Sequence, residues 1–222
     1  DYFTEEWHQR DHKINLPTLT HLSLDQASVF INRLEQHRIE KLILSGFDLY
    51  MDHIKWNEFF LSCEHLKEVK FHRVIHILDL TGFSFKLKSL EYSAKIYQLT
   101  EDKAQIKQNV EAHRETLRNL TFYWEDSDLF KFAIFELKLE KLRCDLSSSG
   151  KFEELKGNET IKTLQLRCIS GSDFDYIKKT FMCFQVVEKF HIEFSARYEE
   201  TIMNALSTSM PKLKVLTLEF AY

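Results

Sequence analysis

Apolar and polar residues alternate in a six-residue pattern along most of the chain, with apolar side chains at the first, fourth and sixth positions. Nine segments carry this pattern: 19–24, 39–44, 66–71, 87–92, 117–122, 139–144, 161–166, 187–192 and 213–218. Chance would give the full pattern, with polar residues at the other three positions, at roughly three sites. Seven of the nine segments meet it, and the other two are interrupted by Ile43 and Val215. Because side chains alternate between the two faces of a strand, each segment predicts a strand with one buried face.

Stretches between these segments place apolar residues at helical spacing. The clearest predicted helix runs from Thr100, as N-cap, through Ile106, Val110 and His113 toward Leu117. The same spacing occurs in four further groups: Val29, Phe30 and Leu34; Ile54, Phe59, Phe60 and Cys63; Phe174, Ile177, Phe181 and Phe184; and Tyr198, Ile202, Leu206 and Met210. A strand and helix of this kind cannot bury their apolar faces alone, whereas stacked units share a core. The chain is therefore predicted to be an α/β solenoid, with a curved parallel sheet of about nine strands on the concave face and helices on the convex face.

The strand segments LKEVKF, LEKLRC and IKTLQL resemble the LxxLxL segment of leucine-rich repeats, which recur about every 20 to 29 residues. The chain departs from that family where an Asn or Cys is expected three positions past the last apolar residue. The order of helix, short turn and LKxLxL, as in FFLSCEHLKEVKF and ALSTSMPKLKVLTL, is most similar to the divergent repeats of F-box proteins.

The resemblance implies that residues 16–222 form a leucine-rich-repeat domain of a longer protein, after a capping or linker segment over residues 1–15. It implies a noncatalytic module that binds a protein partner on its concave face. The specific role implied is substrate receptor of an F-box-type ubiquitin ligase, with the ligase adaptor contacted by a segment absent from this chain. Two alternatives stay open: an adaptor or scaffold in signalling, immune or RNA-export complexes, and a receptor for an anionic small ligand.

The third, fifth and seventh residues of each unit are predicted to face away from the core in three rows. These rows hold six Lys or Arg and six Asp or Glu, a balance that favours a protein partner over a phosphate backbone. The candidate binding residues are Lys141, Arg143, Arg167, Lys189 and His191, from three consecutive strands, with Tyr123 beside them as an exposed interface anchor. An acidic peptide, a phosphorylated segment or a small anion would suit this cluster. In the alternative interpretation, these are solvated strand residues that Asp145 and Glu193 partly neutralise at the rim.

Both arginines, Arg143 and Arg167, are expected to be solvent-facing, so that reversing them to Glu would weaken binding and barely change the melting temperature. Leu164 and its apolar counterparts in the other strands are expected in the core. The ninth strand, with no helix visible after it, is expected to expose an edge and part of the core surface.

Catalytic and cofactor chemistry finds little support in the sequence. GxSxG, GxxxxGK[ST], GxGxxG and HExxH motifs are absent, and the chain has only five glycines, so we predict neither an enzyme nor a cofactor. His8 and His12 could share a helix face as metal ligands, but a third ligand is not apparent, which favours a solvated or capping role. The four cysteines form no CxxC pair; Cys144 is expected to be a small buried apolar residue and Cys168 to lie at a strand-to-loop edge.

Charge and hydropathy suggest where the chain resides. No apolar run approaches the roughly 20 residues of a membrane helix, and a formal net charge of −4 makes nucleic acid an unfavoured partner. Reduced thiols favour an intracellular location, in cytoplasm or nucleus. The two glycosylation sequons, at Asn119 and Asn158, are close to the number expected by chance.

Overall fold

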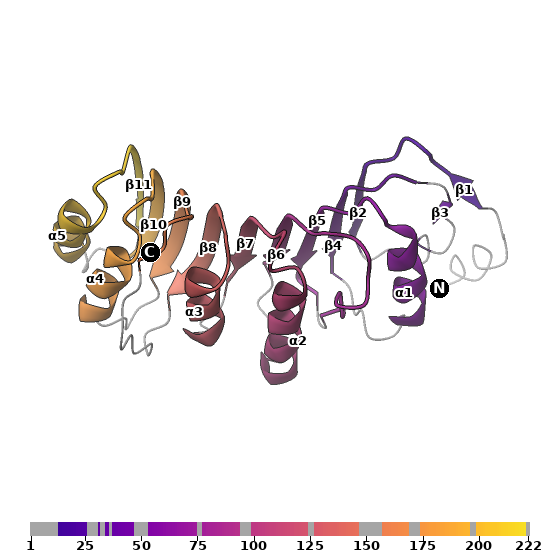
Figure 1. Cartoon of the computed structure of the whole chain (residues 1–222), viewed down its shortest axis with the longest axis horizontal. Helices are drawn as coiled ribbons and strands as arrows, with labels where there is room; N and C mark the ends of the chain where they lie inside the picture. The colour runs from indigo at the N-terminus through magenta and orange to yellow at the C-terminus, as the bar shows by residue number, and fades with distance from the viewer. Residues whose placement is uncertain are drawn as a thin grey trace. The chain divides into compact units, whose positions relative to one another are not determined.

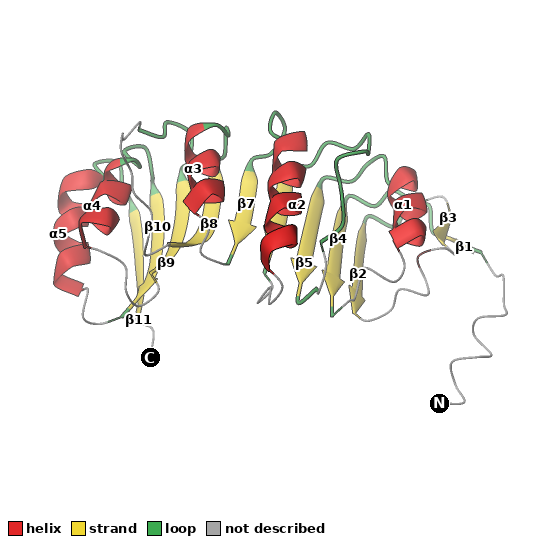
Figure 2. Cartoon of the chain, turned by 90° about the horizontal axis from the view of Figure 1, so that it is seen from below, coloured by secondary structure: helices red, strands yellow, loops and turns green. Residues whose placement is uncertain are grey.

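The computed structural model describes residues 13–25, 31, 34–35, 37–46, 53–74, 77–93, 99–123, 127–146, 157–168, 174–195 and 199–220. The chain divides into two compact units, Asp1–Thr116 and Leu117–Tyr222. Each unit consists of parallel strands with α-helices on one face of them (Figure 1 and Figure 2). The α/β class and the parallel arrangement predicted from the sequence are therefore confirmed.

The first unit contains four parallel strands in the order β6-β5-β4-β2. Their bounds are β2 His21–Asp25, β4 Lys41–Ser45, β5 Glu68–His72 and β6 Ser89–Tyr92. Two helices accompany them, α1 His53–Ser62 and α2 Leu99–Ala112. A separate two-residue parallel pair joins β1 Ile14–Asn15 to β3 Leu34–Glu35. The predicted capping segment falls mostly outside the described residues, which begin at position 13.

The second unit contains five parallel strands in the order β11-β10-β9-β8-β7. Their bounds are β7 Asn119–Phe122, β8 Lys141–Leu146, β9 Thr163–Cys168, β10 Lys189–Phe194 and β11 Val215–Phe220. The helices of this unit are α3 Ser127–Phe135, α4 Phe174–Met182 and α5 Glu199–Ser209. Each strand pairs with the next without a shift, so Lys141 lies beside Thr163 and Thr163 beside Lys189.

Strand formation follows from the alternation of apolar and polar residues. All nine predicted strands are present, and each begins at the third position of its six-residue segment. The fourth and sixth positions are buried in the interior strands, as in Leu142, Leu164 and Leu166 at 0 % exposure. Burying one leucine side chain contributes roughly 1.5–3 kcal/mol, which fixes the face that each strand turns toward the helices.

Most predicted helices are confirmed, with boundaries that differ slightly. Helix α2 begins at Leu99, one residue before the predicted N-cap Thr100, while α1, α4 and α5 lie on the predicted apolar groups. Of the predicted helical group that ends at Leu34, Val29 and Phe30 lie outside the described residues, and Leu34 belongs to strand β3. Helix α3 was not predicted, although it buries Phe130, Ala133 and Ile134 at helical spacing.

The connection between β5 and β6 departs from the predicted alternation of strand and helix, since its described parts, residues 73–74 and 77–88, contain no helix. Aromatic packing takes the helix's place: the Phe60 ring lies 5.3 Å from Phe83 and 5.9 Å from Phe85, measured between centroids. The buried Asn109 side chain on α2 anchors the same connection. Its amide donates to the Leu78 carbonyl at 2.8 Å, and its oxygen accepts from the Leu80 N–H at 2.8 Å.

His113, just after α2, gives the first unit a pH-dependent contribution to stability. The residue is buried, and its ring stacks on Phe85 at 5.7 Å. Burial lowers the pKa of His113 from 6.5, against an opposing effect of the Leu80 backbone and with a further lowering by Lys86. The unfolded chain takes up a proton below pH 6.5 that the folded chain does not. The contribution of His113 is therefore complete above pH 6.5 and is lost as the pH falls through its folded pKa.

We expect the free energy of unfolding to fall more between about pH 7.5 and about pH 5.5 in the wild type than in the His113→Phe variant. Urea denaturation at the two pH values measures the difference. His37, whose pKa burial also lowers, is unchanged in both proteins and cancels in the comparison. Equal pH dependence in the two proteins would contradict the assignment.

Strand β11 shows the exposure expected for the last predicted strand. Leu216 and Phe220, on the side that is buried in the interior strands, are 38 % and 41 % exposed. The Phe220 ring contacts Phe194 of β10, with 5.2 Å between centroids. Among the described strands, β11 pairs only with β10.

Candidate functional site

The open face of the second-unit strands, opposite the helices, carries the candidate binding residues. Its rows follow the strand pairing, so Arg143, Gln165 and His191 form one line across β8, β9 and β10. We define the second-unit strand surface as Tyr123 together with Lys141, Arg143, Asp145, Thr163, Gln165, Arg167, Lys189, His191 and Glu193. The register predicted from the sequence for these positions is confirmed, which places all six predicted site residues on one surface.

The spacing within this surface follows from strand geometry. Lys141 and Arg143 are two residues apart on β8, or roughly 7 Å. Lys189 lies in the same row as Lys141 but two strands away, or roughly 10 Å, because Thr163 of β9 stands between them. The basic side chains therefore surround a polar, uncharged centre formed by Thr163 and Gln165.

Tyr123 holds two guanidinium groups at one end of the surface. The Cζ atom of Arg143 lies 5.4 Å from the Tyr123 ring centroid, and that of Arg167 lies 5.6 Å from it. Both distances are within the roughly 6 Å range of cation–π attraction. The sequence predicted an exposed aromatic anchor, but Tyr123 is only partly exposed because these arginines flank it.

Asp145 corrects the interpretation of a solvated acidic rim. It is 1 % exposed, and Arg167 binds it with two hydrogen bonds, from Nε to Oδ1 at 2.8 Å and from Nη2 to Oδ2 at 2.5 Å. These bonds raise the pKa of Arg167 above its ordinary value. A buried carboxylate needs such a partner, so the expectation that Arg167 could be reversed to Glu with little effect on stability no longer holds.

Arg143 differs from Arg167 although both contact Tyr123. Within the described part of the chain, Arg143 forms no ion pair, and its buried Nε has no hydrogen-bond partner. Lys141 and Lys189 are exposed and likewise form no ion pair with a described residue. His191 lies 3.0 Å from the Glu219 carboxylate through Nε2. On this surface, the basic groups that form no ion pair with a described residue are thus Arg143, Lys141 and Lys189.

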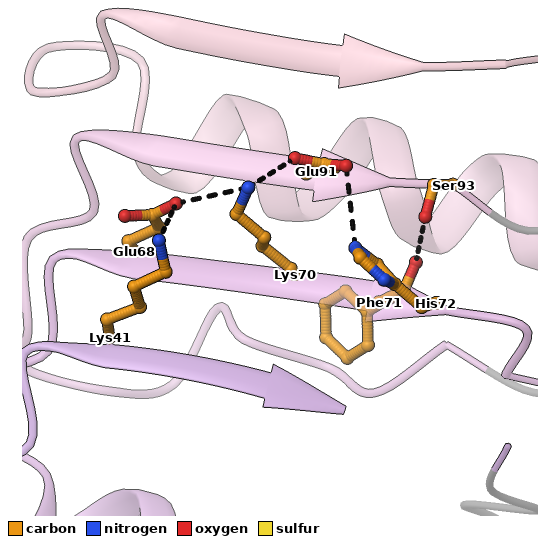
Figure 3. A network of polar contacts seen from close by, with 7 residues as sticks. All are labelled: Lys41, Glu68, Lys70, Phe71, His72, Glu91 and Ser93. Carbon is orange, nitrogen blue, oxygen red and sulfur yellow. Dashed lines mark hydrogen bonds and ion pairs between the residues drawn. The ribbon is translucent and has the colours of Figure 1, made fainter. Parts of the chain in front are cut away.

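On the corresponding face of the first unit, basic and acidic side chains of β4, β5 and β6 form ion pairs with one another (Figure 3). Glu68 accepts ion pairs from Lys41 at 3.2 Å and Lys70 at 3.5 Å. Glu91 lies 2.8 Å from Lys70 and 3.4 Å from His72. Sequence reasoning missed this network, although the signal was present, since Lys41 and Glu68 share one row and Lys70 and Glu91 share the next.

The described residues contain no group of three or more His, Cys, Asp or Glu that could hold a metal ion. His8 and His12 lie outside them. Burial raises the pKa of the Cys63 thiol to about 12 and that of Cys183 to about 11, so these thiols stay protonated and poorly nucleophilic at neutral pH. Cys144 is buried, as expected for a small apolar residue, and Cys168 is the last residue of β9.

The structure also bears on the Asn158 glycosylation sequon and on the search for a membrane helix. Asn158 is buried and its amide donates to the Ile134 carbonyl at 2.7 Å, while its oxygen accepts from the Ile161 N–H at 2.8 Å. This side chain anchors the approach to β9 and is not available to a glycosylating enzyme in the folded chain. Among the described helices, none has the length and apolar character needed to cross a membrane.

Comparisons with family models, curated proteins and solved structures find no match for this chain. The arrangement of helices and parallel strands stands on the structure itself. The leucine-rich-repeat resemblance stays a prediction from the LxxLxL segments and their spacing.

Proposed function

We propose that this chain is a noncatalytic protein-recognition module that binds its partner through the second-unit strand surface. The observation that carries the proposal is the contrast between the two faces of the strands. One face is apolar and covered by helices; the other holds Tyr123 and Arg143 beside exposed lysines. Tyrosine and arginine are the residue types that dominate binding energy at protein interfaces.

The finer role rests on the sequence resemblance. We propose that the strand and helix units are divergent leucine-rich repeats and that the module is the substrate receptor of an F-box-type ubiquitin ligase. An adaptor or scaffold function is the alternative. The two differ in the fate of the bound partner: a ligase receptor shortens its lifetime, so removing the full-length protein from cells should make that partner accumulate. An unchanged partner lifetime would favour the adaptor.

Blocking the centre of the surface tests the recognition function. Gln165 is partly exposed on β9 between Arg143 and His191, and tryptophan is well tolerated in strands. We expect Gln165→Trp to abolish capture of the partner without changing net charge, because the large ring occupies the contact area. The measurement is quantitative mass spectrometry of proteins retained by immobilised wild type and variant from the same cell extract.

The matched control is Gln185→Trp, an exposed position in the turn after helix α4, which also leaves the net charge unchanged. It should retain the proteins that the wild type retains. Both variants should keep the wild-type denaturation midpoint within a few degrees. The proposal fails if nothing is retained specifically, or if every specifically retained protein tolerates Gln165→Trp.

A further inference from the structure

The two units have the same parallel strand arrangement, but the residues beside the basic side chains on their open faces differ in charge. In the first unit, the strand next to Lys41 supplies Glu68, and the strand next to Lys70 supplies Glu91. In the second unit, the β9 residues beside Lys141 and Arg143 are Thr163 and Gln165. The row neighbours that carry carboxylates in the first unit, Glu68 and Glu91, thus correspond to uncharged side chains, Thr163 and Gln165, in the second unit.

Arg143 is one of the basic groups that this difference leaves without an acidic partner among the described residues. Its guanidinium is held over Tyr123, and its Nε is buried without a hydrogen-bond partner in the described part of the chain. Because the Nε atom is closed to solvent, an incoming anion would contact the remainder of the partly exposed Arg143 side chain, whose charge no described acidic group pairs. The pre-positioned guanidinium is thus prepared to receive an anionic oxygen.

We propose, on the basis of the recognition function above, that the partner presents an extended acidic peptide segment with carboxylates at alternate residues. Alternate side chains of an extended chain lie roughly 7 Å apart on one side, the same separation as Lys141 and Arg143 along β8. One carboxylate binds Arg143 and the next alternate carboxylate binds Lys141. Thr163 and Gln165, which make no side-chain hydrogen bond to another described residue, face the peptide backbone.

Spacing and charge balance favour a carboxylate-bearing peptide over the other anions. A single phosphate group is too small to contact basic groups spread over roughly 7 to 10 Å. A nucleic acid requires a larger excess of positive charge. The solvent-facing rows of β8 to β11 hold four Lys or Arg, but also Asp145, Glu193 and Glu219.

The test uses a fluorescently labelled synthetic peptide that alternates glutamate and serine, with a glutamine-and-serine peptide as its uncharged counterpart. Fluorescence anisotropy with the whole chain should show binding of the glutamate peptide that weakens with added salt, and no binding of the counterpart. Arg143→Gln should weaken binding about tenfold, the loss expected for one charge-assisted hydrogen bond. Lys178→Gln, on helix α4, removes one charge from another place and should leave the affinity unchanged.

The inference is overturned if the two peptides bind equally, or if Lys178→Gln costs as much affinity as Arg143→Gln. Tighter binding of inorganic phosphate or of a single-stranded oligonucleotide than of the glutamate peptide would also overturn it. If Gln165→Trp abolishes capture of the partner while Arg143→Gln has no effect on that capture or on the peptide, the recognition function stands and the acidic segment does not. If the glutamate peptide binds as expected but no protein capture depends on Gln165, the anion site stands and the recognition function fails.

Discussion

Replacing Arg167 with methionine should lower the free energy of unfolding by about 2–4 kcal/mol, although the residue lies on the solvent-facing side of β9. The reason is Asp145, which is 1 % exposed and receives two hydrogen bonds from the Arg167 guanidinium. Methionine keeps most of the aliphatic volume but removes both bonds and the positive charge. The buried carboxylate then loses its charged partner, and partial exposure of Arg167 keeps the cost below that of a fully buried pair.

Arg143→Met is the matched control. Arg143 lies on the neighbouring strand, contacts the same Tyr123 ring and has no acidic partner among the described residues. Its replacement should change stability by less than about 1 kcal/mol. Chemical denaturation of both variants, with Asp145→Asn and the Arg167→Met/Asp145→Asn double variant, gives the coupling energy. Equal losses for Arg143→Met and Arg167→Met would contradict the importance of the Asp145 pair.

Leu164→Ala should lower the free energy of unfolding by about 2–5 kcal/mol. Leu164 is fully buried on β9 and lies between Leu142 of β8 and Phe190 of β10 in one row. Alanine leaves a cavity that parallel strands held by hydrogen bonds on both sides cannot close by moving together. The loss therefore combines the missing burial with the cavity that remains.

Thr163→Ala provides the comparison, one residue away in the same strand. Thr163 is partly exposed on the open face, so its replacement should cost less than about 1 kcal/mol. Urea denaturation of the two variants measures the difference between the two faces of one strand. A negligible loss for Leu164→Ala, or equal losses for both, would refute the assigned burial of this face.

The strands were predictable because their pattern is local. A strand buried on one face needs only alternating side chains, and every predicted segment became a strand beginning at its third residue. Strand order and the absence of register shifts are what a stack of similar units would give. The rows on the open face could therefore be read from the sequence, and with them the grouping of Arg143, Arg167 and Lys189 on one surface.

The connections were less predictable because their packing depends on distant partners. Leu34, expected at the end of a helical group, belongs to strand β3, and the described part of the connection from β5 to β6 packs Phe83 and Phe85 against α1 instead of forming a helix. No local sequence pattern predicts that the Asn109 side chain will form hydrogen bonds with the backbone of Leu78 and Leu80, some thirty residues earlier in the chain. Such contacts form only when separate elements meet.

The sequence by itself determined which residues form strands, which face of each strand is apolar and which polar side chains share a row, since these follow from side-chain alternation within each segment. Only the tertiary structure decided how charges on the open face are used. The row neighbours could be read from the sequence, since Arg167 shares a row with Asp145 and Arg143 shares one with Gln165. The structure adds that Asp145 is buried and bound by the Arg167 guanidinium through two hydrogen bonds, whereas Arg143 forms no ion pair with a described residue. That distinction depends on side-chain direction and on solvent exclusion between neighbouring strands, which a linear pattern does not contain.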